Sequence, residues 1–181
     1  ESLIYADHIF RYLPEKEIIF QNCNIHHSSR RAIYLQHSNI SLTHSKIHHP
    51  GSGEGIYIGY SGISKIENNE ITTVQPYCFT IIINFDYSSD GKSYIRNNHL
   101  IELNGYRMIA ITNSNDNGDS PDSIFVENNI FDSMGSSYTY IRTDGINYTL
   151  IKNNIFRNKT RAGADLIFKS NDQSFFRNKL I

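Results

Sequence analysis

The sequence has almost no net charge, few cysteines and no long apolar run. Its 181 residues include 17 Lys and Arg against 18 Asp and Glu, so the formal net charge is only −1. A chain this close to neutrality has no general electrostatic attraction for nucleic acid or for an anionic membrane. No apolar stretch reaches bilayer-spanning length, and no signal peptide is present. Helical spacing is not sustained anywhere, which leaves short strands as the expected elements.

The sequence does contain a six-residue motif that occurs seven times. Its template is apolar, polar, Asn, polar, any residue, apolar, as in residues 66–71, and only the copy with His44 in place of Asn departs from it. The copies begin at Phe20, Leu42, Ile66, Ile95, Val126, Ile151 and Phe176. Successive copies start 22 to 31 residues apart. A period of roughly 20 to 50 residues is typical of repeat architectures.

A second apolar element follows each motif at a nearly constant distance of 15 to 17 residues. Its last residues are Leu35, Ile58, Ile83, Ile111, Ile141 and Phe168. Each repeat therefore supplies two short strands, and strands that cannot pair within a repeat must pair with those of the next. We predict parallel strands stacked about 4.8 Å apart in a solenoid of about seven coils. The first residue of each motif and the last residue of each second strand should face inward.

The recurring Asn indicates how the turn after the first strand is held. A side-chain amide stacked on its copy in the next coil can donate and accept along the axis, which forms a ladder of buried amides. Asn also tolerates the left-handed backbone of a tight turn. We expect the ladder to contain Asn22, Asn68, Asn97, Asn128, Asn153 and Asn178, with His44 as an irregular rung.

The spacing, the paired strands and the Asn column together resemble the right-handed parallel β-helix of the pectate-lyase-like superfamily. The resemblance implies an all-β fold, a single-stranded right-handed parallel β-helix forming one domain over residues 1–181. Because the chain begins at Glu1 and stops at Ile181 on the last residue of a motif copy, we expect it to be truncated at both ends. Lyases, hydrolases, epimerases and phage tailspikes share this scaffold, so the resemblance alone selects no function. It does imply a secreted, cell-surface or periplasmic location.

The cysteines and histidines do not predict a cross-link or a metal site. Cys23 and Cys78 fall two coils apart, beyond the limit of about 7 Å between the Cα atoms of a disulfide, so both are predicted to be free thiols. The pairs at residues 26–27 and 48–49 place four histidines on adjacent coils, which would suit a metal or proton transfer. No carboxylate accompanies them to complete a ligand set, so a solvated turn is favoured.

Two coils are overlong, with insertions at residues 85–91 and 113–122 that both leave the C-terminal end of the second strand. Insertions on one face of a solenoid often mark its binding face. The second insertion places oxygen-bearing side chains at alternate positions before Gly118, as in a calcium loop, but lacks the closing bidentate Glu. We therefore expect no cofactor, with calcium at this loop as the alternative.

Charged residues in the outward columns of the second strands converge beside these insertions. The predicted catalytic residues are Lys169, Arg142, Asp144 and Asp86. The predicted substrate-binding residues are Tyr34, Tyr57, Tyr140 and Asn84. Aromatic faces suit sugar rings, so this face predicts a carbohydrate ligand.

One chemistry that these residues predict is β-elimination on a uronate. A base removes the proton α to the carboxylate while a cation stabilises the developing charge. Lys169, one coil above Arg142, could act as the base, because a like charge about 5 Å away lowers the pKa of the amine. The run from residue 153 to residue 178 resembles the lysine-bearing coil of the chondroitinase-B-like and alginate lyases. In that family the partner arginine follows the lysine by one coil, which would fall beyond Ile181.

The alternative chemistry is glycoside hydrolysis by two carboxylates. Asp86 and Asp144 are expected two coils, or about 9.6 Å, apart, at the upper end of the separation for an inverting pair. Residues 142–145, Arg-Thr-Asp-Gly, faintly resemble the Asn-Thr-Asp-Gly signature of polygalacturonases.

The sequence thus predicts a carbohydrate-active β-helix that acts on or binds an acidic, uronate-containing polysaccharide, lyase-like if it is catalytic. Two alternatives remain open. One is a non-catalytic glycan-binding or adhesive segment of a surface protein. The other is a structural coil of a fibre or tailspike, which would form a trimer.

Overall fold

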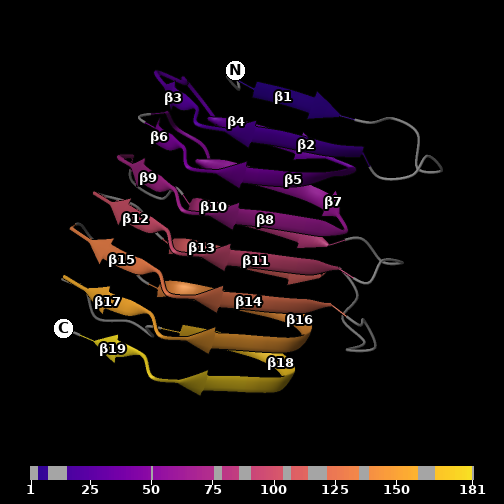
Figure 1. Ribbon diagram of the computed structural model, residues 1–181, viewed down its shortest axis with the longest axis vertical. Helices are drawn as coiled ribbons and strands as arrows, with labels where there is room; N and C mark the ends of the chain where they lie inside the picture. Colours follow the sequence, from indigo (N-terminus) through magenta and orange to yellow (C-terminus); the bar gives the residue numbers. More distant parts are fainter. Residues whose placement is uncertain are drawn as a thin grey trace.

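The computed structural model describes residues 4–7, 16–49, 51–75, 79–85, 91–103, 107–113, 122–134, 139–158 and 166–180. Every strand pair among them is parallel, and none of them is helical (Figure 1). The predicted all-β parallel solenoid is therefore confirmed.

The strands stack in three rows along the axis. The β2 row contains β2 (Lys16–Gln21), β5 (Ser38–Thr43), β8 (Ile63–Glu67), β11 (Lys92–Arg96) and β14 (Ser123–Glu127). The β3 row contains β3 (Asn24–His26), β6 (Lys46–His49), β9 (Glu70–Thr73), β12 (His99–Glu102), β15 (Ile130–Ser133), β17 (Ile155–Arg157) and β19 (Lys179–Leu180). The β4 row contains β1 (Ile4–Asp7), β4 (Ile33–Gln36), β7 (Ile56–Ser61), β10 (Phe79–Phe85) and β13 (Arg107–Asn113).

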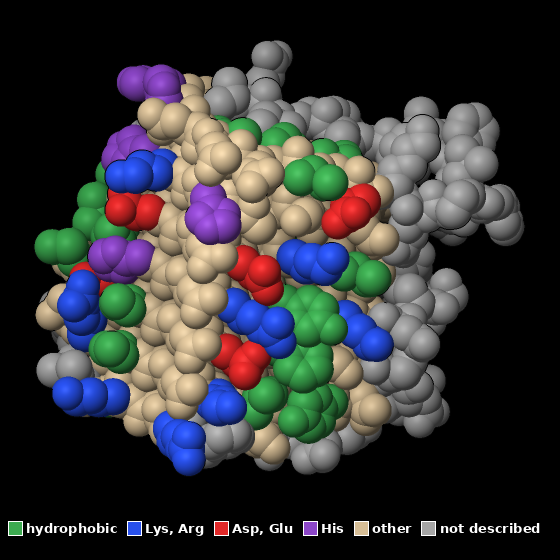
Figure 2. Space-filling view, in the orientation of Figure 1, with side chains coloured by type: hydrophobic (Ala, Val, Ile, Leu, Met, Phe, Trp, Pro, Cys, Tyr) green, Lys and Arg blue, Asp and Glu red, His purple; other side chains and the backbone are tan. Residues whose placement is uncertain are grey.

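Two longer strands, β16 (Thr139–Lys152) and β18 (Leu166–Phe176), bend to join the β4 row to the β2 row. Five successive turns, from β2–β3–β4 to β14–β15–β16, make up the regular solenoid. That is slightly fewer than the predicted seven coils, and the remaining described strands continue the same stacking. Figure 2 shows charged and apolar side chains gathered on the β2 row and on the β3 row, with a band of turn atoms between them.

The core consists of the predicted inward rows. In the β2 row the fully buried residues are Leu42, Ile66, Ile95, Val126 and Ile151, and Phe20 packs against them. In the β4 row they are Leu35, Ile58, Ile83, Ile111 and Ile141. Each such aliphatic side chain gains roughly 1.5–3 kcal/mol from burial. The side chains of Phe168 and Phe176 lie outside the described residues.

The predicted register is wrong in the last two repeats. Ile109 pairs with Ile141, and Ile111 pairs with Thr143, so the second strand begins two residues later than its Thr-Tyr-Ile pattern indicates. Further on, Gly145 is an extra, left-handed residue of β16, with φ of 68°. Such a bulge shifts all later pairs by one. As a result Ile151 pairs with Phe175 and not with Phe176.

The amide ladder exists, but one residue later than predicted. The predicted rungs Asn22, Asn68, Asn97, Asn128 and Asn153 are exposed, with φ between 54° and 58°, and His44 has φ of 51°. Their side chains face outward, so they serve as the left-handed turn residues that Asn was expected to supply. The buried rungs are Asn69, Asn98, Asn129 and Asn154, followed by Asn178.

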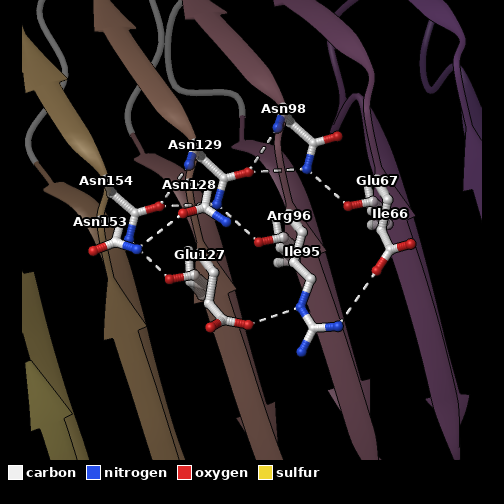
Figure 3. Close-up of polar contacts among 11 residues, drawn as sticks. Ile66, Glu67, Ile95, Arg96, Asn98, Glu127, Asn128, Asn129, Asn153 and Asn154 are labelled. Carbon is white, nitrogen blue, oxygen red and sulfur yellow. Dashed lines mark hydrogen bonds and ion pairs between the residues drawn. The ribbon is translucent and has the colours of Figure 1, made fainter.

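Each rung satisfies its neighbours in the same way (Figure 3). The side-chain oxygen of Asn129 accepts the backbone N–H of Asn98 at 2.9 Å and its side-chain amide at 3.0 Å. The Asn98 amide also donates to the carbonyl of Ile66 at 2.7 Å. Asn178 is a rung as predicted, because the one-residue shift in β18 places it opposite Asn154. Towards the N-terminus Ser45 replaces the amide and accepts the N–H of Cys23.

Candidate functional site

The outer face of the β4 row holds most of the predicted site residues. Tyr34 and Tyr57 occupy the same position on β4 and β7, with ring centroids 5.0 Å apart and ring planes 16° apart. Because the rings cover one another's faces, this pair presents ring edges and phenol oxygens to a ligand more than open faces.

An arginine that the sequence did not single out accompanies these rings. The guanidinium carbon of Arg31 lies 4.8 Å from the Tyr34 centroid and 5.1 Å from the Tyr57 centroid. Arg31 also forms an ion pair with Glu54, and both side chains are about one-fifth exposed. Arg31 was missed because it lies in the turn before β4, where no strand periodicity marks it.

A hydrogen-bonded strip continues from Tyr57 along the axis. The amide of Asn84 donates to the Tyr57 hydroxyl at 3.0 Å, and the hydroxyl of Thr112 donates to the Asn84 side-chain oxygen. In the strand register Gly59, Asn84, Thr112 and Asp144 follow one another. The predicted binding residues Tyr57 and Asn84 therefore belong to one connected polar strip.

The predicted catalytic residues are brought only partly together. Nη2 of Arg142 lies 2.9 Å from Oδ2 of Asp144. Lys169 pairs in register with Asp144, whereas Arg142 pairs with Ile167. The prediction that Arg142 occupies the same column as Lys169 is therefore wrong, because the β16 register is two residues later than expected. The same shift places Asp144 in the column of Asn84 and Thr112, and not in the column predicted for Asp86. Asp86 itself lies outside the described residues, so its separation from Asp144 stays a prediction.

Tyr140 was predicted to bind substrate but is a core residue. It is 2% exposed, and its hydroxyl donates to the carbonyl of Arg157 at 2.8 Å. Its ring packs on Phe131 and Phe156 at centroid distances of 6.1 and 5.1 Å. The two-residue register shift explains the error. In the observed register Tyr140 lies one residue before the segment 141–143, which pairs with residues 109–111. The residues at the equivalent position in the other coils, Ala32, Gly55, Thr80 and Met108, are also buried.

A buried carboxylate connects the residues at the ends of the two insertions. Oδ1 of the fully buried Asp122 accepts the N–H of Gly91 at 2.7 Å, and its other oxygen accepts the amide of Asn113. A Cβ at position 91 would lie 2.4 Å from Oδ1, so this contact requires glycine. Residues 86–90 and 114–121, including most of the predicted calcium loop, lie outside the described residues. Calcium there stays a prediction.

An open hollow of about 460 Å³ lies elsewhere, beside the ladder turn. Its lining residues are His44, Ser45, Lys46, Asn68, Asn69, Glu70, Asn97 and His99. Nζ of Lys46 lies 3.7 Å from Oε1 of Glu70. Of the predicted histidine stack, His26 and His48 pair in register on β3 and β6. In the described part of the chain, no group of three or more His, Cys, Asp or Glu residues could hold a metal ion. Cys23 is free, as predicted, and Cys78 lies outside the described residues.

Asp132 on the β3 row is a carboxylate held by several donors. Oδ2 of Asp132 lies 2.9 Å from Nε and 2.7 Å from Nη2 of Arg157, and 3.6 Å from Nε2 of His99, while Asn158 donates to Oδ1. Burial raises the pKa of Asp132, but the hydrogen bonds from Asn158 and Arg157, the charge of Arg157 and the contact with His99 outweigh it. The pKa therefore lies below its ordinary value of 3.8.

A comparison with protein families confirms the fold and its handedness. The family model described as a right handed beta helix region matches residues 9–118, more than half of the chain. No curated protein and no solved structure matches the sequence. Among the described residues there is no helix long and apolar enough to cross a membrane.

Proposed function

The chain belongs to the right-handed β-helix family, and we propose that it binds an acidic, uronate-containing polysaccharide on the outer face of the β4 row. The fold itself supports a carbohydrate-active or surface β-helix domain, and the finer assignment depends on the site. The observation that carries the proposal is the strip of Tyr57, Asn84, Thr112 and Asp144 on four successive strands.

An extended polymer lying along the solenoid axis would meet one polar group in each coil, about every 4.8 Å. Hydroxyl and amide groups both donate and accept, as sugar hydroxyls do. Arg31 and Arg142 lie on this face beside Tyr57 and Asp144. Each guanidinium has five N–H donors, more than one carboxylate partner uses, so each can also bind a uronate carboxylate.

The test is titration calorimetry with alginate, a uronate polymer, and with dextran, a neutral one. We expect binding to alginate only, and an affinity reduced about tenfold, roughly 1.4 kcal/mol, by Arg142→Gln or Asn84→Ala. Lys65→Gln on the β2 row is the matched control, because it removes a cation from another face. Unchanged affinity in Arg142→Gln and Asn84→Ala, or equal loss in the control, would contradict the proposal.

Lyase activity is a second candidate, because Lys169 and Arg142 lie on the neighbouring strands β18 and β16. The lysine amine would take the proton α to the carboxylate, a carbon–carbon double bond would form, and the bond to the leaving sugar oxygen would break as that oxygen takes a proton from water. Lys169 pairs in register with Asp144 and not with Arg142, so the base and the cation that this reaction needs do not occupy one column. Binding is therefore preferred to turnover.

Ultraviolet absorbance of unsaturated uronate would detect β-elimination, and release of saturated reducing ends would detect hydrolysis with Asp86 and Asp144. Absorbance that rises with the wild type and is lost in Lys169→Ala would establish the lyase. A polysaccharide ligand also implies a secreted, cell-surface or periplasmic location, as the family resemblance does.

A further inference from the structure

The outer face of the β2 row carries a second surface, unrelated to the proposed glycan site. Its residues form three in-register rows of four along β8, β11, β14 and the second half of β16. The charged row is Glu67, Arg96, Glu127 and Lys152. The middle row is Lys65, Tyr94, Phe125 and Leu150, and the outer row is Ile63, Lys92, Ser123 and Tyr148.

The centre of this surface is apolar. The rings of Tyr94 and Phe125 stack with centroids 5.1 Å apart and planes 10° apart, and Tyr148 lies 5.9 Å from Phe125. Ile63 at the margin is 38% exposed. Figure 2 shows an apolar area flanked by charges on this part of the molecule. An apolar area with a charged rim is typical of a surface that binds another protein.

The charged row alternates in sign. Nε of Arg96 lies 2.8 Å from Oε2 of Glu127, and Nη1 lies 3.7 Å from Oε1 of Glu67 (Figure 3). Lys152 follows Glu127 in register. Along the axis the signs are therefore negative, positive, negative, positive.

If a second copy of this row runs in the opposite direction, each charge faces a charge of the opposite sign. A two-fold axis parallel to the strands, placed between β11 and β14, reverses the order of the coils and keeps each row opposite itself. Glu67 then faces Lys152 of the second copy, and Arg96 faces Glu127 of the second copy. A two-fold interface needs this self-complementarity, whereas a three-fold assembly does not.

The other two rows fit the same axis. Tyr94 faces Phe125 of the second copy, Ile63 faces Tyr148, and Lys65 faces Leu150, so no two like charges meet. A two-fold axis along the solenoid and over the middle row would instead place Arg96 opposite Lys92. Like charges in contact disfavour an interface, so the charges select the first axis.

We propose that the β2-row face binds a second copy of this chain, forming a two-fold dimer with antiparallel solenoid axes. The two sheets pack face to face with aligned strands, at the separation of about 10 Å that is usual for stacked sheets. The proposal does not depend on glycan binding, since the β4-row site uses other strands and the first half of β16.

The experiment is light scattering on two charge-reversed variants, alone and mixed. The wild type should have twice the monomer mass of 20.8 kDa. Arg96→Glu places two carboxylates opposite each other across the axis, and Glu127→Arg places two cations there, so each variant alone should be monomeric. An equimolar mixture should regain the dimer mass, because every changed charge then faces an unlike one. A loss of folding cannot produce that regain.

A second variant leaves the ion pairs of Arg96 intact, and its rescuing change, Lys65→Glu, removes only the 3.9 Å contact between Lys65 and Glu17. Leu150→Lys faces Lys65 of the second copy, but within its own chain it lies between Phe125 and Ser174 in register. It should weaken the dimer, and adding Lys65→Glu to the same chain should restore it. A monomeric or trimeric wild type would overturn the proposal, as would variants that stay dimeric or a mixture of the charge-reversed variants that stays monomeric.

Discussion

The ladder turn and the outer face of the β4 row belong to the same repeat, but the turn repeats one residue type in successive coils and the face does not. At the turn, successive coils place the same group at the same position, from Asn69 to Asn178, and each amide satisfies the next. On the face, the equivalent positions hold Gln36, Gly59, Asn84, Thr112 and Asp144. Stacked identical amides satisfy one another, whereas the face presents a different polar group in each coil. The repeating position should therefore govern stability and the non-repeating one recognition.

Tyr140→Ala should cause the largest loss in the free energy of unfolding, because Tyr140 is a core residue. Truncating a buried aromatic residue costs about 3–5 kcal/mol, and this ring fills the space between Phe131 and Phe156. Urea denaturation would measure the loss. Tyr57→Ala, on the β4-row face, should lose much less stability. If instead Tyr140→Ala left stability unchanged and abolished glycan binding, Tyr140 would belong to the site.

Asn98→Ala should have the next largest effect. It removes the acceptor for the side-chain amide of Asn69 and the donor to the Ile66 carbonyl, and an unsatisfied buried polar group costs about 1–3 kcal/mol. Asn97→Gly is the matched control, since Asn97 is exposed and glycine accepts its φ of 54° freely. That substitution should change the free energy of unfolding by no more than about 0.5 kcal/mol. Equal shifts in the denaturation midpoint would show that the rung has been assigned to the wrong residue.

Acid should destabilise the wild type partly through Asp132. Its folded pKa is below 3.8, so between the two values the unfolded chain binds more protons than the folded one, and stability rises with pH. The contribution of Asp132 to stability is fully present above about pH 4. It is lost as the pH falls through the lower pKa of the folded state. Asp132→Asn should be less stable at neutral pH and should lose less further stability on acidification. Melting temperatures of both proteins across that range would test this, with Asp144→Asn on the β4-row face as the control.

The sequence predicts the fold because two periodicities agree. The motif starts and the second apolar elements recur together, and their inward rows were correct from Leu42 to Ile151 and from Leu35 to Ile111. It could not choose between adjacent Asn residues such as Asn97 and Asn98. Both suit a tight turn, and only the left-handed backbone decides which side chain faces inward.

The candidate site was predictable only where strands are regular. Tyr57 and Asn84 follow from counting outward positions, and the structure joins them. The predicted position of Tyr140 was wrong because the polar residue Thr143 faces inward in this strand. A search for apolar residues at inward positions therefore placed the strand two residues too early. Arg31 and Asp122 lie in turns, where no period exists to reveal them.

The most direct test measures stability and alginate affinity on the same two variants. Asn98→Ala should lower the free energy of unfolding by about 1–3 kcal/mol and leave the affinity of the folded protein unchanged. Arg142→Gln removes a part-buried ion pair whose side chains are 31% and 27% exposed. It should change stability by less than about 1 kcal/mol, yet weaken alginate binding about tenfold. Stability and affinity should therefore be lost in different variants. This expectation would be contradicted if Asn98→Ala weakened binding by the folded protein, or if Arg142→Gln reduced stability and left affinity intact.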